Sequence, residues 1–289
     1  MRPGSRLATV AGVLAALMVQ PALAQVTLMP DGPGAYAGGV DALDVRLDVS
    51  TDGDGATAAR LTVSMDGAAV FEKRYDDLFA MFEVPVVQIA EIDPANESRE
   101  VFLSSYTGGA HCCNLVSAVT ATASGDWTEV EIGQFDGGPV PESLTDRNGD
   151  GAAEFMTHDG RFLYQFASYA GSYAPPLILG VRGGERVDLT ADPDFQWHVR
   201  ARLDRMGDIP AAGESRNSWL ATHAAIQLLL GEPDPLARAD AEYDPDVTWG
   251  LEYCRDADVA IYDCPEAETA SRPFPEALRL FLTETGYME

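Results

Sequence analysis

Lysine is nearly absent from this chain of 289 residues, and positive charge of any kind is scarce. Lys73 is the only lysine, and 19 Lys and Arg residues stand against 46 Asp and Glu residues, which gives a formal net charge of −27. Nucleic-acid binding depends on clustered cations that neutralise phosphates. The composition therefore excludes a nucleic-acid partner and is typical of a highly soluble acidic protein.

Long apolar runs are missing after the first 24 residues. At the N-terminus, Arg2 and Arg6 precede the apolar stretch Leu7–Val19, and Ala22-Leu23-Ala24 follows it. This order is typical of a secretory signal peptide with a small-residue cleavage site, and the stretch is shorter than the ~20 residues that span a bilayer. We expect residues 1–24 to be removed and the mature chain to be periplasmic or secreted, without a transmembrane segment.

Familiar catalytic motifs are absent as well. The chain has no Gly-x-Ser-x-Gly, no His-Glu-x-x-His and no phosphate-binding glycine loop, and its four histidines are scattered. These absences favour a binding or structural module with an unknown protein or glycan partner. The alternative is a hydrolase or other enzyme whose site is assembled from distant residues at the seam between the β and helical parts of the chain.

What the sequence does contain is a series of short runs of β-branched and aromatic residues within residues 25–190. They are ARLTVSM, AAVFEKRY, VPVVQIAEI, REVFLSSY, NLVSAVTAT, DWTEVEIG and PLILGVRG. Turn-forming pairs such as Asp66-Gly67 and Gly183-Gly184 separate them. The pattern predicts a mostly antiparallel β region built of propeller-blade-like or sandwich-like repeats.

From residue 191 to residue 289 the apolar spacing becomes helical. Asn217 or Ser218 is expected to cap a helix that Gly231 and Pro233 bring to an end. Further helices are expected over residues 194–206, 235–242, part of 249–263, and 275–285. The fold class predicted from the sequence is α+β, with a small helical unit after the β region.

Two degenerate copies of a repeat lie in the β region. Each has an aspartate, a polar loop, a glutamate that opens an apolar strand, and then Ser-Tyr-x-Gly. These residues are Asp93, Glu100, Ser105 and Tyr106 in the first copy, and Asp146, Glu154, Ser168 and Tyr169 in the second, which has a longer insertion. Repetition in fixed order predicts blades or hairpin units stacked side by side.

The second copy contains the loop TDRNGDGAAEF, with side-chain oxygens at alternate positions. Asp146, Asn148 and Asp150 stand at positions one, three and five, and the hard calcium ion takes six to eight such oxygens. An EF-hand is excluded because Thr157 stands at position twelve. Glu154 at position nine and the Ala152 carbonyl complete the expected ligands of a structural Ca2+ ion. The alternative is an ordinary pair of Asn-Gly and Asp-Gly turns without metal.

This loop resembles the calcium loop of FG-GAP or VCBS-type repeats, the blade units of integrin-like β-propellers. The resemblance implies Asp146, Asn148, Asp150 and Glu154 as ligands, although Glu154 replaces the usual aspartate. The first copy has lost most of these ligands, and the β region is too short for seven blades. The segment SYTGGAHCCN resembles one in exported bacterial proteins of unassigned function.

The chain has four cysteines, which an exported protein generally pairs as disulfides. Of the three possible connectivities we favour Cys254–Cys264, which leaves Cys112–Cys113 as a pair of neighbours. The other two would join the helical tail to the β region. A zinc site or a reactive thiol at His111 and these two cysteines is an alternative, but adjacent side chains on a strand point to opposite faces.

Overall fold

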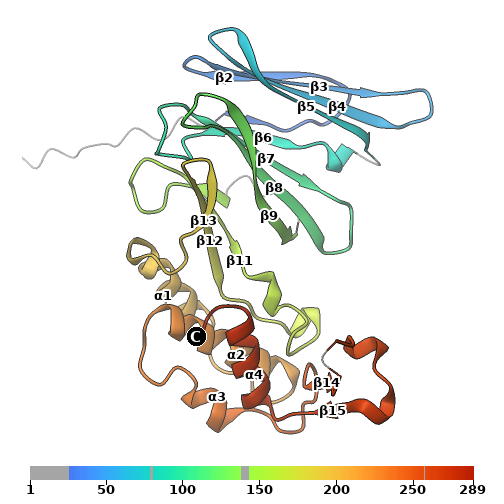
Figure 1. Cartoon of the computed structure of the whole chain (residues 1–289), viewed down its shortest axis with the longest axis vertical. Coiled ribbons are helices and arrows are strands. Elements are labelled where there is room, and N and C mark those ends of the chain that lie inside the picture. Colours follow the sequence, from blue (N-terminus) through green and yellow to red (C-terminus); the bar gives the residue numbers. More distant parts are fainter. Residues whose placement is uncertain (1–25, 79–80, 138–142, 257) are drawn as a thin grey trace, which may run out of the picture.

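The computed structural model describes residues 26–78, 81–137, 143–256 and 258–289, so the expected signal peptide, residues 1–24, lies outside the described residues. Antiparallel sheets follow one another along the molecule, and the helices gather at the far end (Figure 1). This arrangement confirms the predicted α+β class.

Three sheets make up the β region. The first contains β2 (Gly34–Val40), β3 (Leu43–Thr51), β4 (Thr57–Met65) and β5 (Ala68–Leu78) in that order. The second has the order β1 (Val26–Leu28), β6 (Val86–Ala90), β7 (Glu100–Tyr106), β8 (Cys112–Ala121) and β9 (Trp127–Asp136). The third contains β10 (Leu144–Thr145), β11 (Glu154–His158), β12 (Pro176–Arg182) and β13 (Glu185–Asp188). Apart from β1, each sheet is a simple meander.

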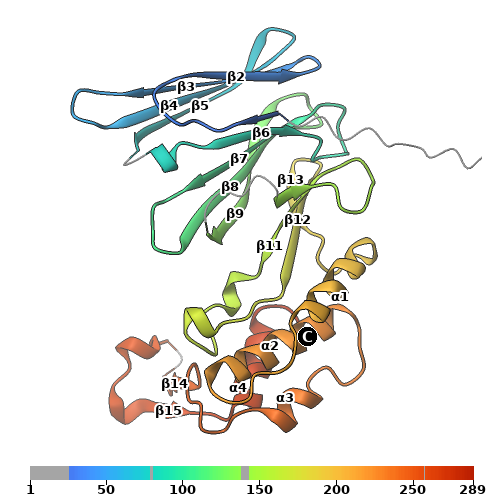
Figure 2. The same cartoon turned by 180° about the vertical axis from the view of Figure 1, so that it is seen from behind.

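The second sheet is covered on both faces. Along β7, Val101 and Leu103 enter a core shared with the first sheet, whereas Phe102 enters a core shared with the third. Since successive side chains of a strand alternate between faces, such a run is apolar without alternation. By contrast, β3 alternates buried and exposed residues, because one face of the first sheet meets solvent. Figure 2 shows the three sheets as successive layers, with the second sheet between the first and the third.

The helical unit surrounds α2 (Glu214–Leu229), whose residues from Asn217 to Ile226 are all buried. Around it lie α1 (Gln196–Arg205), α3 (Ala237–Glu242) and α4 (Phe274–Glu284). The insertion between β11 and β12 also belongs to this core, since Phe162, Phe166 and Ala174 pack into it. No helix among the described residues has the length and apolarity needed to cross a membrane.

The predicted cap of α2 is wrong. The helix begins at Glu214 after Gly213, and both Asn217 and Ser218 lie inside it. Their side chains make tertiary hydrogen bonds instead: Asn217 accepts from the amide of Asp244 (2.8 Å), and Ser218 accepts from the amide of Tyr173 (2.8 Å). Polar residues that usually favour caps are here used to dock neighbouring loops.

The helix expected within residues 249–263 is also wrong. This segment holds the short strand β14 (Glu252–Cys254), which pairs with β15 (Thr269–Ser271), and a 3-10 turn at Ile261–Asp263. A disulfide joins Cys254 to Cys264 with their Cα atoms 5.6 Å apart. A continuous helix would hold these residues ~15 Å apart, so the crosslink and the extended segment require each other.

Candidate metal centre

The acidic loop connects β10 to β11, as its sequence predicts. The Asp146 carboxylate accepts hydrogen bonds from the amides of Gly149 (2.7 Å) and Gly151 (3.1 Å). Asn148 accepts from the amide of Asp150 (3.0 Å), and Asp150 in turn accepts from the amide of Ala152 (2.8 Å). Gly149 and Gly151 both have positive φ, which permits the tight turn. The side-chain oxygens are thereby folded onto one short loop.

Glu154 closes this loop from the first position of β11 and is completely buried. Its Oε2 accepts from the amide of Arg147 (3.1 Å), whereas Oε1 has no hydrogen-bond partner among the described residues. Burial, followed by repulsion from Asp150 and Asp146, raises the pKa of Glu154 to about 7. A buried carboxylate oxygen without a donor is costly unless it is protonated or binds a cation.

In the first copy of the repeat, protein donors satisfy both oxygens of the corresponding buried carboxylate. Glu100, the counterpart of Glu154, is also fully buried, and burial raises its pKa to about 7. Its Oε2 accepts from the amides of Ile92 (2.7 Å) and Asp93 (3.0 Å), and its Oε1 accepts from the side chains of Asn96 (3.0 Å) and Thr120 (3.2 Å). An amide donor thus stands where the second copy leaves an oxygen without one.

The two copies also touch each other. The amide of Ala153 donates to the carbonyl of Glu91 (2.7 Å). Arg182, on β12, donates from Nη1 to the carbonyl of Ile92 (3.1 Å), and its Nη2 lies 3.8 Å from the carboxylate of Asp150. The acidic loop is therefore part of the contact between the second and third sheets.

The Asp93 carboxylate strengthens this contact. It accepts from the amides of Gly183 (2.8 Å) and Gly184 (2.7 Å), the turn between β12 and β13. Both glycines have positive φ, and two successive amides directed at one carboxylate form an anion-binding nest. The sequence predicts the turn but not this role, because the partner lies 90 residues away along the chain.

The loop supplies the donor types that calcium prefers: carboxylates from Asp146, Asp150 and Glu154, the Asn148 amide oxygen, and the carbonyl of the buried residue Ala152. Among the described residues, no group of three or more His, Cys, Asp or Glu side chains is gathered as it would be around a metal ion. Binding would therefore have to draw the three carboxylates together.

Residues 199–286 match a protein family. Its description is the sll0997 C-terminal domain, and the matched residues run from within α1 to just past the end of α4, outside the acidic loop. The chain is 39% identical over 212 residues to the "Probable thylakoid lumen protein sll0997" of Synechocystis sp., a match over 71% of this chain and 61% of the relative.

A second relative is the "Uncharacterized protein y4bJ" of Sinorhizobium fredii, 34% identical over 212 residues. That match covers 70% of this chain and 32% of the relative. The chain thus spans less than two thirds of the length of either relative. No solved structure matches the chain.

Beyond the region matched by the sll0997 C-terminal domain, the structure pairs Cys112 with Cys113 at the start of β8, as favoured from the sequence. Gln134, on β9, donates from its side-chain amide to both sulfur atoms. The turn before them depends on Gly109, because a Cβ there would lie 2.0 Å from the carbonyl oxygen of Cys112. The element is thus a compact disulfide turn at the end of the second sheet.

His111 belongs to the same turn and stacks on Tyr169, with ring centroids 3.8 Å apart. The Tyr169 hydroxyl donates to Asp136, and this bond raises the pKa of Tyr169 to about 12. These residues lie at the seam where the sequence allowed for a nonlocal site. The Tyr169 ring covers a face of the imidazole, so the contact is a packing of the second sheet on the insertion that follows β11.

The other three histidines are packed side chains. Burial lowers the pKa of His158, His198 and His223. His223 stacks on Trp219 at 4.8 Å inside the helical core. His223 is buried, whereas His158 and His198 are half-buried.

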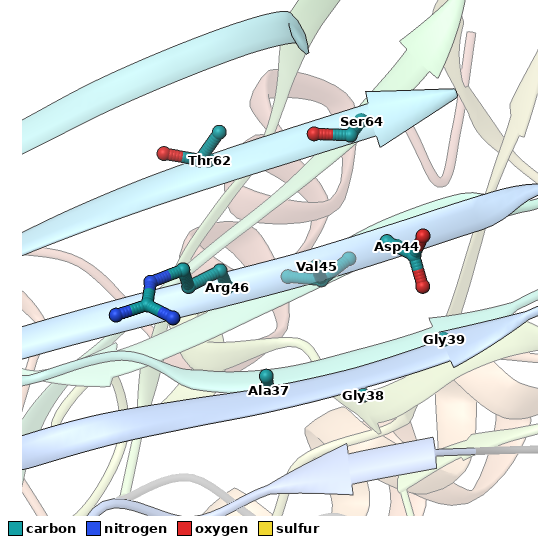
Figure 3. A pocket seen from close by; sticks show the side chains of 8 residues that line it. All are labelled: Ala37, Gly38, Gly39, Asp44, Val45, Arg46, Thr62 and Ser64. Carbon is teal, nitrogen blue, oxygen red and sulfur yellow. The ribbon is translucent and has the colours of Figure 1, made fainter. Parts of the chain in front are cut away.

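A shallow groove of about 340 Å3 crosses the solvent-facing side of the first sheet (Figure 3). Arg46 at its edge forms an ion pair with Asp48 on the same strand (2.6 Å). Gly39 lies beside Asp44, where a Cβ would come within 2.3 Å of the carboxylate. The groove follows from the small residues of β2 and differs from the acidic loop in having no buried polar group aimed into it from its lining.

Proposed function

We propose that the protein is an exported binding or structural module whose β-sheets are stabilised by one calcium ion in the acidic loop. Its ligands are the side chains of Asp146, Asn148, Asp150 and Glu154 and the carbonyl of Ala152. The observation that carries the proposal is the fully buried Glu154, whose Oε1 has no donor among the described residues beside two further carboxylates.

The export half of the proposal is supported by two independent features. The N-terminal sequence has the order of a signal peptide, and the Synechocystis relative is named a probable thylakoid lumen protein. A lumen, like a periplasm, is reached by export from the compartment of synthesis. We place the mature protein in the periplasm or the extracellular medium, where calcium is available and disulfides persist.

The structural role of the ion follows from the position of the loop. Asp150 faces Arg182, and Ala153 binds Glu91, so ordering the loop also orders the contact between the second and third sheets. The FG-GAP or VCBS-like interpretation of the repeat is part of this proposal. Calcium then has a structural role, in which it stabilises the contact between the second and third sheets, and takes no part in catalysis.

Calorimetric titration of the mature, oxidised protein with calcium tests this proposal. We expect one site, loss of that site in Asp150→Ala, and a higher melting temperature with calcium than with chelator, because an ion bound only by the folded form stabilises it by mass action. Glu72→Gln is the matched control, since Glu72 is an exposed carboxylate on β5 in the first sheet. An unchanged melting temperature at millimolar calcium would refute the proposal.

A further inference from the structure

A cleft of about 710 Å3 opens between the first and second sheets. One wall is β5, with Lys73, Tyr75 and Asp77, and the other is formed by β7, β8 and β9. This volume lies within the range of small-molecule sites, ~300 to 1,000 Å3. The cleft and the acidic loop lie on opposite sides of the second sheet, because the cleft shares the face that packs on the first sheet.

The charge of the cleft is strongly one-sided. Four carboxylates line it, those of Asp77, Glu83, Glu129 and Glu131, against a single ammonium group, that of Lys73. No arginine is among the lining residues. Such an excess of one sign between low-dielectric walls raises the local concentration of oppositely charged ligands.

Lys73 is already engaged inside the cleft. Its ammonium donates to both oxygens of Glu129 (2.7 and 2.8 Å), and Ser117 donates to the same carboxylate (2.7 Å). Lys73 also lies over the ring of Tyr75, 4.9 Å from its centroid. The only lysine of the chain therefore neutralises one carboxylate, and Asp77 and Glu131 add further negative charge to the cleft.

Apolar side chains cover much of the remaining surface. Leu78, Pro85 and Leu103 line the cleft, together with Leu115, which is 43% exposed. An inorganic cation would gain nothing from these walls, whereas a molecule with an apolar body would bury surface against them. The two halves of the lining, acidic and apolar, thus select for an amphipathic ligand.

We propose that this cleft binds a small organic cation. Its ammonium or guanidinium group lies among Asp77, Glu129 and Glu131, and its apolar body packs on Leu78, Leu103 and Leu115. The cation shares Glu129 with Lys73 or displaces the lysine from it. This inference goes beyond the calcium proposal and does not depend on it.

Two probes with one fluorophore and opposite charge test the proposal: dansylcadaverine, a primary ammonium, and dansylglycine, a carboxylate. We expect the mature protein to bind the ammonium probe saturably, with a blue shift of its emission, and not the carboxylate probe. The titration is run once with excess calcium and once with chelator. Binding in both shows that the cleft stands independently of the acidic loop, and equal binding of the two probes, or none at millimolar concentration, overturns the proposal.

Variants of the lining residues test whether the ammonium probe binds in this cleft and whether negative charge strengthens its binding. Glu131→Gln and Asp77→Asn should each weaken binding of the ammonium probe about fivefold, because each removes one nearby negative charge. Lys73→Met should strengthen binding of the ammonium probe about fivefold, because Glu129 loses its internal counterion. Glu185→Gln, an exposed carboxylate on the third sheet, serves as the control of equal charge change.

Lys73→Met separates this proposal from its opposite. If Lys73 were the anchor of an anionic ligand, the variant would lose affinity instead of gaining it. A thermal melt of each variant accompanies the titration. Should Lys73→Met fail to fold, Glu131→Gln still decides the matter, because Glu131 is exposed and its replacement keeps the shape of the side chain. Unchanged affinity in Glu131→Gln and Asp77→Asn overturns the proposal.

Discussion

Glu154 and Glu100 occupy equivalent positions in the two copies of the repeat, and both are fully buried. Glu100 receives hydrogen bonds on both carboxylate oxygens, whereas Oε1 of Glu154 receives none from the described residues. One copy is therefore closed by protein donors, and the other leaves one carboxylate oxygen without a donor among the described residues. The contrast within one chain is what makes the calcium proposal testable by single substitutions.

The first prediction concerns pH. Burial raises the pKa of Glu154 to about 7, so between its ordinary value of 4.5 and about 7 the folded state holds a proton that the unfolded chain has released. Without calcium, the contribution of Glu154 to the free energy of unfolding should therefore be highest below this window and fall by about 3 kcal/mol as the pH rises through it. Urea unfolding in chelator between pH 4.5 and 8 measures the loss.

Calcium and Glu154→Gln should each flatten that dependence. The ion favours the ionised carboxylate, and glutamine carries no titrating proton. Glu100 has a similarly raised pKa and contributes a slope that neither change removes, so only part of the effect disappears. An identical pH dependence with calcium, with chelator and in Glu154→Gln would contradict the assignment.

The second prediction concerns Asn96, whose side-chain amide donates to Glu100 and to Thr120. Asn96→Asp replaces this donor by a second carboxylate, so we expect the free energy of unfolding to fall by about 2–3 kcal/mol at neutral pH. The loss should shrink as the pH is lowered and one carboxylate is protonated. Glu97→Gln, an exposed change in the same loop, should stay within about 0.5 kcal/mol of the parent.

Much of the β region could be predicted because the runs of apolar residues are bounded by turns. Glu154, the glutamate expected to open an apolar strand, is the first residue of β11, Glu154–His158. Strands β2 and β3 were not among the predicted runs. Glycines at positions 34, 38 and 39 weaken the signal of β2, whereas β3 alternates clearly and could have been found by the same criterion.

The candidate site was predictable only where its residues are local. Asp146, Asn148 and Asp150 fall at regular spacing in one loop, so the sequence alone indicates them. Arg182 is 32 positions from Asp150 along the chain and has no motif of its own, so only the packing of β12 places it there. The prediction that Asn217 or Ser218 caps α2 is wrong for a similar reason, because distant loops bind the same polar side chains.

Arg182 is the subject of the third prediction. Its guanidinium lies 3.8 Å from Asp150 and would compete electrostatically with an ion bound in the loop. Arg182→Met should strengthen calcium binding about threefold to fivefold, since a nearby positive charge is removed. It should also lower the stability of the calcium-free protein by about 1 kcal/mol, because the carbonyl of Ile92 loses its donor.

Calorimetric titration and urea unfolding measure these two effects separately. Arg186→Met is the control, since Arg186 is an exposed arginine of the adjacent strand β13. It should leave both the calcium affinity and the stability unchanged. Weaker calcium binding in Arg182→Met would show that the arginine orders the loop rather than competing with the ion.

The two disulfides should differ in what they contribute to stability. The Cys254–Cys264 bond has a sequence separation of 10 in the helical unit, so replacing both cysteines by serine should cost about 2–3 kcal/mol through the regained freedom of the unfolded chain. The Cys112–Cys113 bond joins neighbours and closes almost no loop. The corresponding double serine variant should therefore lose less than about 1 kcal/mol by the same mechanism. Thermal melts of the two variants decide the matter, and a larger loss at Cys112 and Cys113 would mean that the disulfide turn, with its contacts to Gln134, holds the end of the second sheet in place.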